Sequence, residues 1–396
     1  MESLKLLFVA FEFPPYPLAG TGMYALNLLN NLNKHEITLI TADHKGSIKE
    51  EINSNIKIIK LDTSSSSESS VNRSFIDKKS LFSMKARKYL KNINLKDYNV
   101  LHSLTLRDGA FLDYRYLNNH LKTVISVNDY YIIGSSFNPF NFEFTTDFPV
   151  RYFHHNIMKN FYFKALRDCD KIIPNTNFVK DIILKDSNIP PSKIAVVNRG
   201  INTSRFESDP PKNKYFSHNV LFVGPNAERK GAIYVLKSAP EIVKKFPDST
   251  FTIIGNSSWI YKKKMNNFLR KHDLSCRVNF IDHIPQDELV GYYKKANVFV
   301  MPSVMEAFGQ VYLEAMTAKT PVIGADVGGV SDIITPEIGY LVPPKNHDAI
   351  SKSIIDLFND SDRARVLGEN GNNLVKEKFS IGRMVKETED VYKSLV

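Results

Sequence analysis

The chain has 396 residues, of which 43% are hydrophobic and 24% charged, so it can bury more than one hydrophobic core. No apolar run reaches the roughly 18 residues that a membrane-spanning helix needs. The net charge of +10 favours phosphate-rich partners in general, without choosing among nucleotides, anionic lipids and nucleic acids.

The cysteines and the first residues both predict a cytoplasmic protein. Cys169 and Cys276 are too few for a disulfide framework and lack the spacing of metal ligands, which fits a reducing compartment. The N-terminal residues include an acid, no basic leader and no small-residue cleavage site, so we expect no export signal.

Strands and helices alternate through the first half of the chain. A buried strand at 4–13 is followed, after a break rich in Pro and Gly, by a helix over 23–35 and a strand at 36–42. This order predicts a parallel sheet with right-handed crossovers. Further strands are predicted at 56–61, 99–104, 122–127 and 171–175.

The pattern starts again after 198–219, an irregular stretch rich in Pro, Asn and Ser that is typical of an interdomain linker. The sequence therefore predicts an α/β protein with two doubly wound, Rossmann-like domains, at 1–198 and 199–376. The second half predicts strands at 220–224, 249–255, 277–281 and 297–303, and helices at 232–246, 261–273 and 287–296.

Four loops that follow predicted strands are candidates for a ligand site between the two domains. Ligands of open parallel sheets bind at the carboxyl ends of the strands, and pockets favour domain interfaces. The loops are residues 17–22, 126–131, 224–231 and 302–310.

The last of these loops leads into a helix predicted over 310–319. Gly309 stands where the helix begins. The backbone N–H groups of Gly309, Gln310 and Val311 therefore lack partners within the helix and can cradle a phosphate or a sugar hydroxyl.

Two carboxylates flank this helix start. Glu306 precedes it, and Glu314 can reach the same place from the helix and accept hydrogen bonds from a vicinal diol such as ribose. The alternative is that Glu314 is a solvated helical residue and Glu306 a helix cap.

The surrounding stretch, "FVMPSVMEAFGQVYLEAMTAKTPVIGADVGGVSDII" at 299–334, resembles the signature of the retaining glycosyltransferase family 4. The resemblance covers nearly the whole chain and implies the GT-B fold, in which we expect a C-terminal helix, about 377–396, to pack on the first domain. It continues, in the family's order, at 12–32, 193–202, 222–231, 279–300 and 339–344.

The resemblance implies transfer of a sugar from a nucleotide-diphosphate sugar to an acceptor hydroxyl, with retention and without a cofactor. By this resemblance, Glu314 binds the donor ribose, Glu306 binds the transferred sugar, and the amides of Gly309 to Val311 hold the sugar and diphosphate. Front-face attack within an ion pair is expected, with the donor phosphate taking the acceptor proton. We expect no metal, since the predicted loops contain no Asp-x-Asp dyad and no His or Cys cluster.

Arg229 and Lys230 occupy the place where the family puts positive charge against the donor diphosphate. They are expected to neutralise the leaving group as the glycosidic bond breaks. The commoner form of the family has an arginine directly after the first glycine of this loop, where this chain has Pro225. Without the resemblance, the two cations are ordinary surface residues at a helix start.

Four residues of the first domain complete the candidate site. Gly20 and Gly22 match the family's glycine loop near the β-phosphate and the acceptor. Asn128 stands where the family usually has a histidine that contacts the transferred sugar, so the donor sugar or the acceptor geometry is expected to differ. His102 is either a sugar or acceptor contact or a histidine satisfied within the core.

The helix predicted over 77–96 suggests where the acceptor comes from. Phe82, Ala86, Tyr89 and Ile93 form an apolar stripe on it. A basic amphipathic helix suits an anionic membrane, so we expect a lipid-linked glycan or glycolipid acceptor and peripheral association with the inner face of the cell membrane. The basic residues around the stripe are Lys78, Lys79, Lys85, Arg87, Lys88, Lys91 and Lys96.

Three alternatives remain open. The stripe can instead pack on the first domain's sheet, and the enzyme can be a soluble transferase acting on a free sugar or small metabolite. The basic stretch 261–273 motivates a nucleic-acid-binding module, but no nucleic-acid motif accompanies it, and we expect no such partner.

The aromatic-rich run at 130–148 is a candidate acceptor pocket or lid. The nucleotide base, the sugar, the linkage and the oligomeric state are left open.

Overall fold

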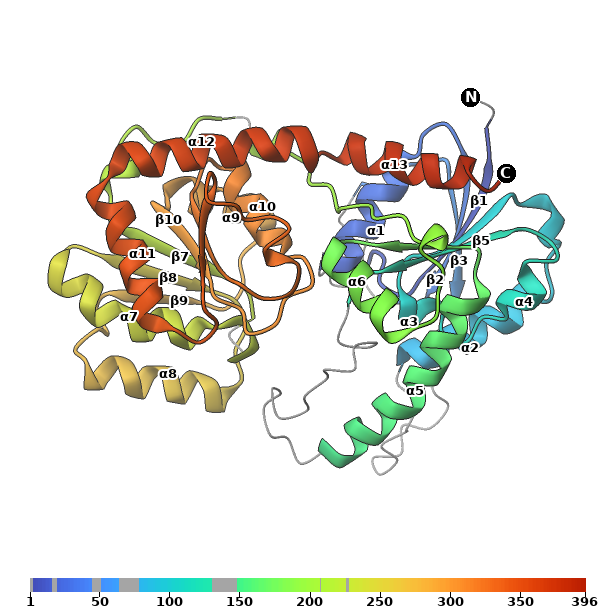
Figure 1. The fold of residues 1–396 in the computed structure, drawn as a ribbon, viewed down its shortest axis with the longest axis horizontal. Coiled ribbons are helices and arrows are strands. Elements are labelled where there is room, and N and C mark those ends of the chain that lie inside the picture. The colour runs from blue at the N-terminus through green and yellow to red at the C-terminus, as the bar shows by residue number, and fades with distance from the viewer. Residues whose placement is uncertain are drawn as a thin grey trace. The chain divides into compact units, whose positions relative to one another are not determined.

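The computed structural model describes residues 3–15, 20–44, 51–63, 78–129, 148–206, 208–225 and 228–396. These residues form two compact units, each built around its own sheet (Figure 1). The first unit takes the described residues up to Gly200 together with Ile381–Val396, and the second takes Ile201–Ser380. Apart from Phe148, the aromatic-rich run at 130–148 lies outside the described residues.

The first unit contains a six-stranded sheet in the order β3-β2-β1-β4-β5-β6. Every neighbouring pair is parallel, as the alternation of strands and helices predicts. The strands are β1 (Lys5–Ala10), β2 (Glu36–Ala42), β3 (Ile56–Leu61), β4 (Val100–Ser103), β5 (Lys122–Val127) and β6 (Lys171–Pro174).

Helices pack around this sheet. The short helices α3 and α4 were not predicted from the sequence; Thr105 and Asp113 cap them by accepting hydrogen bonds from backbone N–H groups. Helix α1 begins three residues before its predicted start, so Gly20 and Gly22 lie in its first turn. The helices are α1 (Gly20–Asn31), α2 (Lys78–Leu90), α3 (Leu106–Gly109), α4 (Tyr114–Leu117), α5 (Phe148–Asp168), α6 (Asn177–Asp186) and α13 (Ile381–Lys393).

The last helix, α13, forms part of the first unit's core. Met384 and Tyr392 are fully buried and belong to the same apolar cluster as Leu28 and Leu29 of α1. Residues from the two ends of the chain therefore build one core.

Helix α2 turns its apolar side inward. Phe82 and Ala86 are fully buried, and the Phe82 ring lies edge-on to the ring of Phe11 with centroids 5.7 Å apart. The apolar stripe of α2 therefore packs within the first unit, which agrees with the alternative that the stripe packs on the first domain's sheet. None of the described helices is long and apolar enough to cross a membrane. The exposed cations on and just after α2 are Lys78, Arg87, Lys88, Lys91 and Lys96.

The second unit repeats the architecture in the order β12-β11-β10-β7-β8-β9, again all parallel. The strands are β7 (Asn219–Val223), β8 (Thr250–Ile254), β9 (Val278–Ile281), β10 (Val298–Met301), β11 (Val322–Ala325) and β12 (Gly339–Val342). The helices are α7 (Ala232–Lys245), α8 (Trp259–Lys271), α9 (Gln286–Lys295), α10 (Gln310–Thr317), α11 (His347–Asn359) and α12 (Ser361–Lys378).

Helices cover both faces of the second sheet. Helix α7 packs against α8 and α11, whereas α10 packs against α9 and α12 (Figure 1). The predicted fold class, two doubly wound α/β units, is confirmed. Helix α10 ends at Thr317, two residues before its predicted end, because the chain turns at Lys319, whose φ is 57°.

Candidate active site

Two loops of the second unit meet at the carboxyl ends of β7 and β10. One contains the short 3-10 turn Glu228–Lys230, and the other leads to α10. The Val304 N–H donates to the Arg229 carbonyl at 2.8 Å, and the Lys230 ammonium forms an ion pair with the Glu306 carboxylate. The structure therefore brings together Arg229, Lys230 and Glu306.

Glycine permits this close approach. Gly231, before α7, has a φ of 84°, and a Cβ there would lie 2.2 Å from the carbonyl oxygen of Pro302. Gly309, before α10, has a φ of 88°, and a Cβ there would lie 2.5 Å from the Tyr312 ring. Left-handed backbone and lack of space together require glycine at both positions.

Glu306 is buried but stays ionised. Its side chain is 10% exposed and that of Lys230 is 14% exposed. Burial by itself raises the pKa of Glu306, but the charge and hydrogen bond of Lys230, helped by the charge of Arg229, hold that pKa below its ordinary value. The pair can thus offer a cation to an anionic ligand and a carboxylate to a hydroxyl.

The N-terminus of α10 adjoins this pair, since Gly309 lies against the Glu306 side chain. The first N–H groups of a helix have no partners within it, so those of Gly309, Gln310 and Val311 can meet a ligand at the positive end of the helix dipole. Two buried atoms nearby, Ser303 Oγ and Gln310 Oε1, have no hydrogen-bond partner among the described residues. Buried polar atoms normally have partners, which a bound ligand or water would supply here.

Glu314 lies within α10 and is held by a tyrosine. Its Oε2 accepts a hydrogen bond from the Tyr293 hydroxyl at 2.7 Å, and the residue is 9% exposed. Burial raises the pKa of Glu314 to about 7, although the Tyr293 hydrogen bond and the charge of Arg205 oppose the rise. Glu314 is therefore not a solvated helical residue, and its carboxyl group titrates near neutral pH.

Both halves of the chain match known protein families. Residues 18–205 match the family model described as Glycosyltransferase Family 4, and residues 201–374 match the model described as Glycosyl transferases group 1. The chain belongs to glycosyltransferase family 4.

Two relatives illustrate the range of this family. An uncharacterized glycosyltransferase of Methanocaldococcus jannaschii is 25% identical over 98% of either chain. A Corynebacterium glutamicum protein, named as a GDP-mannose-dependent monoacylated alpha-(1-6)-phosphatidylinositol monomannoside mannosyltransferase, is 26% identical over 46% of this chain and 51% of its own length.

Solved structures confirm the GT-B fold of this glycosyltransferase. Sucrose-phosphate synthase from Thermosynechococcus elongatus superposes with a TM-score of 0.78 at 19% identity, covering 99% of each chain. HepE from Anabaena, in complex with UDP and glucose, superposes with a TM-score of 0.74 at 15% identity, covering 99% of this chain and all of its own.

In the first unit of the glycosyltransferase, Asn128 follows β5 and is buried. Its side-chain Nδ2 donates to the Leu104 carbonyl at 2.8 Å, and its backbone carbonyl accepts from the Asn175 amide at 3.3 Å. The orientation of Asn128 is thus fixed at the carboxyl end of the sheet. Gly22 is buried in the first turn of α1, and Gly20 is exposed there.

His102 belongs to the core of the first unit. Its Nδ1 lies 2.7 Å from the Tyr392 hydroxyl and its Nε2 lies 2.8 Å from Ser126 Oγ. Burial lowers the pKa of His102 to about 3, so the ring is neutral. Because both ring nitrogens already have partners, the structure favours the satisfied core histidine over a sugar or acceptor contact.

Sequence reasoning missed Tyr293 and Ser303. Tyr293 had a signal: it follows Val290 at helical spacing, and both face the core. No sequence signal indicated Ser303, because a serine after a strand is common in loops.

No group of three or more His, Cys, Asp or Glu side chains in the described ranges could hold a metal ion. The metal independence of the enzyme stays a prediction.

Proposed function

We propose that the second unit binds a nucleotide-diphosphate sugar and that the enzyme transfers the sugar with retention of its anomeric configuration. The observation that carries this proposal is the buried ion pair of Lys230 and Glu306 beside the N-terminus of α10. The pair and the helix offer a cation and amide donors to a diphosphate, and a carboxylate to sugar hydroxyls.

In the proposed reaction, Lys230 and Arg229 stabilise the diphosphate as its bond to the sugar breaks. Negative charge grows on this leaving group in the transition state, so fixed cations lower the barrier. Glu306 accepts hydrogen bonds from the transferred sugar and supports positive charge at its anomeric carbon. The donor phosphate takes the acceptor proton, and because two side chains neutralise the diphosphate, no metal ion is required.

Glu314 is proposed to bind the ribose of the donor. An ionised carboxylate can accept hydrogen bonds from both ribose hydroxyls, and Tyr293 fixes the position of one of its oxygens. Since the carboxyl group titrates at about pH 7 in the free protein, donor binding should strengthen as the pH rises through neutrality.

The nucleotide base of the donor differs among similar proteins, since HepE is solved with UDP and the Corynebacterium relative is named for GDP-mannose. A binding experiment can identify the base that this enzyme prefers. Thermal-shift measurements with UDP-, GDP- and ADP-sugars should show one base raising the melting temperature by about 2–4 °C at saturating donor. Lys230→Ala should lose this shift. Equal, small responses to all donors in the wild type and the variant would contradict the donor site.

We further propose that the acceptor is lipid-linked and that the first unit meets an anionic membrane through charge alone. The apolar side of α2 is buried, so contact depends on the exposed lysines on and after this helix.

Sedimentation with vesicles tests this contact. The protein should sediment with phosphatidylglycerol-containing vesicles at low salt and not with phosphatidylcholine alone. Lys88→Glu/Lys91→Glu should release it, whereas the control Lys244→Glu/Lys245→Glu, on α7 of the second unit, should not. Failure of the wild type to sediment would favour a soluble transferase acting on a free sugar or small metabolite.

A further inference from the structure

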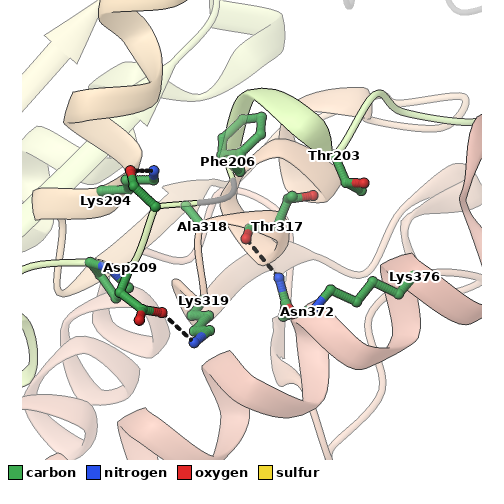
Figure 2. Close-up of a pocket in the computed structure, with 11 residues that line it drawn as sticks. Thr203, Phe206, Asp209, Lys294, Thr317, Ala318, Lys319, Asn372 and Lys376 are labelled. Carbon is green, nitrogen blue, oxygen red and sulfur yellow. Dashed lines mark hydrogen bonds and ion pairs between the residues drawn. The ribbon is translucent and has the colours of Figure 1, made fainter.

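The second unit contains a pocket at the C-terminal end of α10, with a volume of about 350 Å³ (Figure 2). The ion pair of Lys230 with Glu306 adjoins the N-terminal end of the same helix, which has eight residues and is therefore about 12 Å long. Since α10 connects β10 to β11, its N-terminal end lies at the carboxyl ends of the strands and its C-terminal end at their amino ends. The pocket is therefore separate from this ion pair, and Glu314 is not among its lining residues.

Three lysines from three different elements line this pocket. Lys294 comes from α9, Lys319 from the turn after α10, and Lys376 from α12 (Figure 2). Lys294 is buried and donates a hydrogen bond to the Ser208 hydroxyl. Among the described lining residues the acid is Asp209, whose exposed carboxylate pairs with Lys319 at 3.0 Å. Among the described lining residues, positive charge is thus in excess.

A fourth lysine lies behind the lining. Lys214 is 1% exposed, and its ammonium donates to the Ala318 carbonyl at 2.8 Å and to Thr320 Oγ1 at 2.6 Å. Burial, and then the charges of Lys294 and Lys319, lower the pKa of Lys214 well below its ordinary value. The positive charges of Lys294 and Lys319 therefore act on Lys214, and a bound anion would offset them.

Lys319 occupies an unfavourable backbone position. Its φ of 57° lies in the left-handed region, which costs free energy for a residue with a Cβ and favours glycine. The backbone there is fixed, since the Tyr215 hydroxyl donates to the Lys319 carbonyl at 2.7 Å. The Lys319 cation therefore lies at the pocket although its backbone conformation costs free energy.

We propose that this pocket binds a small phosphate ester, with its phosphate among Lys294, Lys319 and Lys376. Lysine ammonium groups are strong donors to phosphate. Thr203 and Asn372 add polar groups and Phe206 an apolar wall, which suit a sugar attached to the phosphate. The volume falls at the small end of the usual range for ligand pockets, as a sugar phosphate requires.

Calorimetric titration of the full chain with inorganic phosphate and with glucose 6-phosphate tests this site. Both should bind, and glucose 6-phosphate more tightly, because it also meets the polar lining. Lys319→Gly, which suits the left-handed backbone, and Lys376→Glu should each weaken binding about tenfold. Lys378→Glu, an exposed change two residues along α12 and outside the lining, should leave binding within about twofold.

The double variant Lys230→Met/Glu306→Gln, which neutralises both partners of the buried ion pair and so keeps the second unit folded, separates this site from the candidate active site. It should retain glucose 6-phosphate binding, because neither residue is part of the pocket. Loss of binding in this double variant with retention in Lys376→Glu would assign the ligand to the candidate active site and overturn the proposal. Equal weakening by Lys378→Glu, tighter binding of phosphate than of its ester, or no binding to the wild type at about 10 mM would overturn it too.

Discussion

Glu314→Gln will reduce transfer and, at alkaline pH, stabilise the second unit. The folded pKa of Glu314, about 7, lies above its ordinary value of 4.5, so the folded state binds more protons between these pH values. Wild-type stability therefore falls as the pH rises through this window, by about 3 kcal/mol in total. Glutamine does not ionise, and its oxygen can still accept the Tyr293 hydrogen bond.

The melting temperatures of wild type and Glu314→Gln should accordingly coincide at about pH 4.5 and separate at about pH 8, with the variant higher. The donor KM should rise at least tenfold, because an amide replaces the charged acceptor for the ribose hydroxyls. Glu377→Gln, at an exposed site on α12, should change neither quantity. A stability difference independent of pH would contradict the burial of an ionisable carboxyl, and an unchanged KM would contradict its contact with the donor.

Lys230→Met will destabilise the second unit and remove most of its activity. The change leaves the Glu306 carboxylate buried without its ion-pair partner, which costs about 3–5 kcal/mol. Turnover should fall about 100- to 1,000-fold, because the leaving diphosphate loses a fixed cation. Chemical denaturation and single-turnover kinetics measure the two effects separately.

The double variant Lys230→Met/Glu306→Gln distinguishes stability from catalysis. Neutralising both partners should recover most of the lost stability while transfer stays low. Lys262→Met, which breaks an exposed ion pair with Asp282 in the same unit, should cost less than about 1 kcal/mol. Recovery of turnover in the double variant would mean that neither the Lys230 cation nor the Glu306 carboxylate acts in catalysis and that the pair only stabilises the fold.

The elements of this fold were largely predictable, because buried strands of parallel sheets read as continuous apolar runs. "LKLLFVAF" and "NVFVMPS" are of this kind, and the turns after them need glycine or proline. The capped single turns α3 and α4 were not predictable, since four residues show no period. The stripe of α2 allowed two interpretations, because the same periodicity suits a sheet and a membrane.

The site was predictable only as far as neighbouring residues determine it. Gly309 and its helix start follow from local signals, and the ion pair of Lys230 with Glu306 joins two loops that share one edge of a parallel sheet. The partner of Glu314 depends on how α9 and α10 pack, so Tyr293 could not be chosen over Tyr292 as its hydrogen-bond donor. The pocket at the other end of α10 combines distant segments and could not be anticipated.

The position of α13 has a consequence for how the protein is made. Since Met384 and Tyr392 belong to the same core as α1, the first unit cannot finish folding until α13 has been synthesised. The described residues of the second unit lie within one stretch of sequence, Ile201–Ser380, which is synthesised before α13. Domains usually fold in the order in which they are synthesised. Here the second unit should fold before the first, whose core stays incomplete and exposes apolar surface until α13 is available.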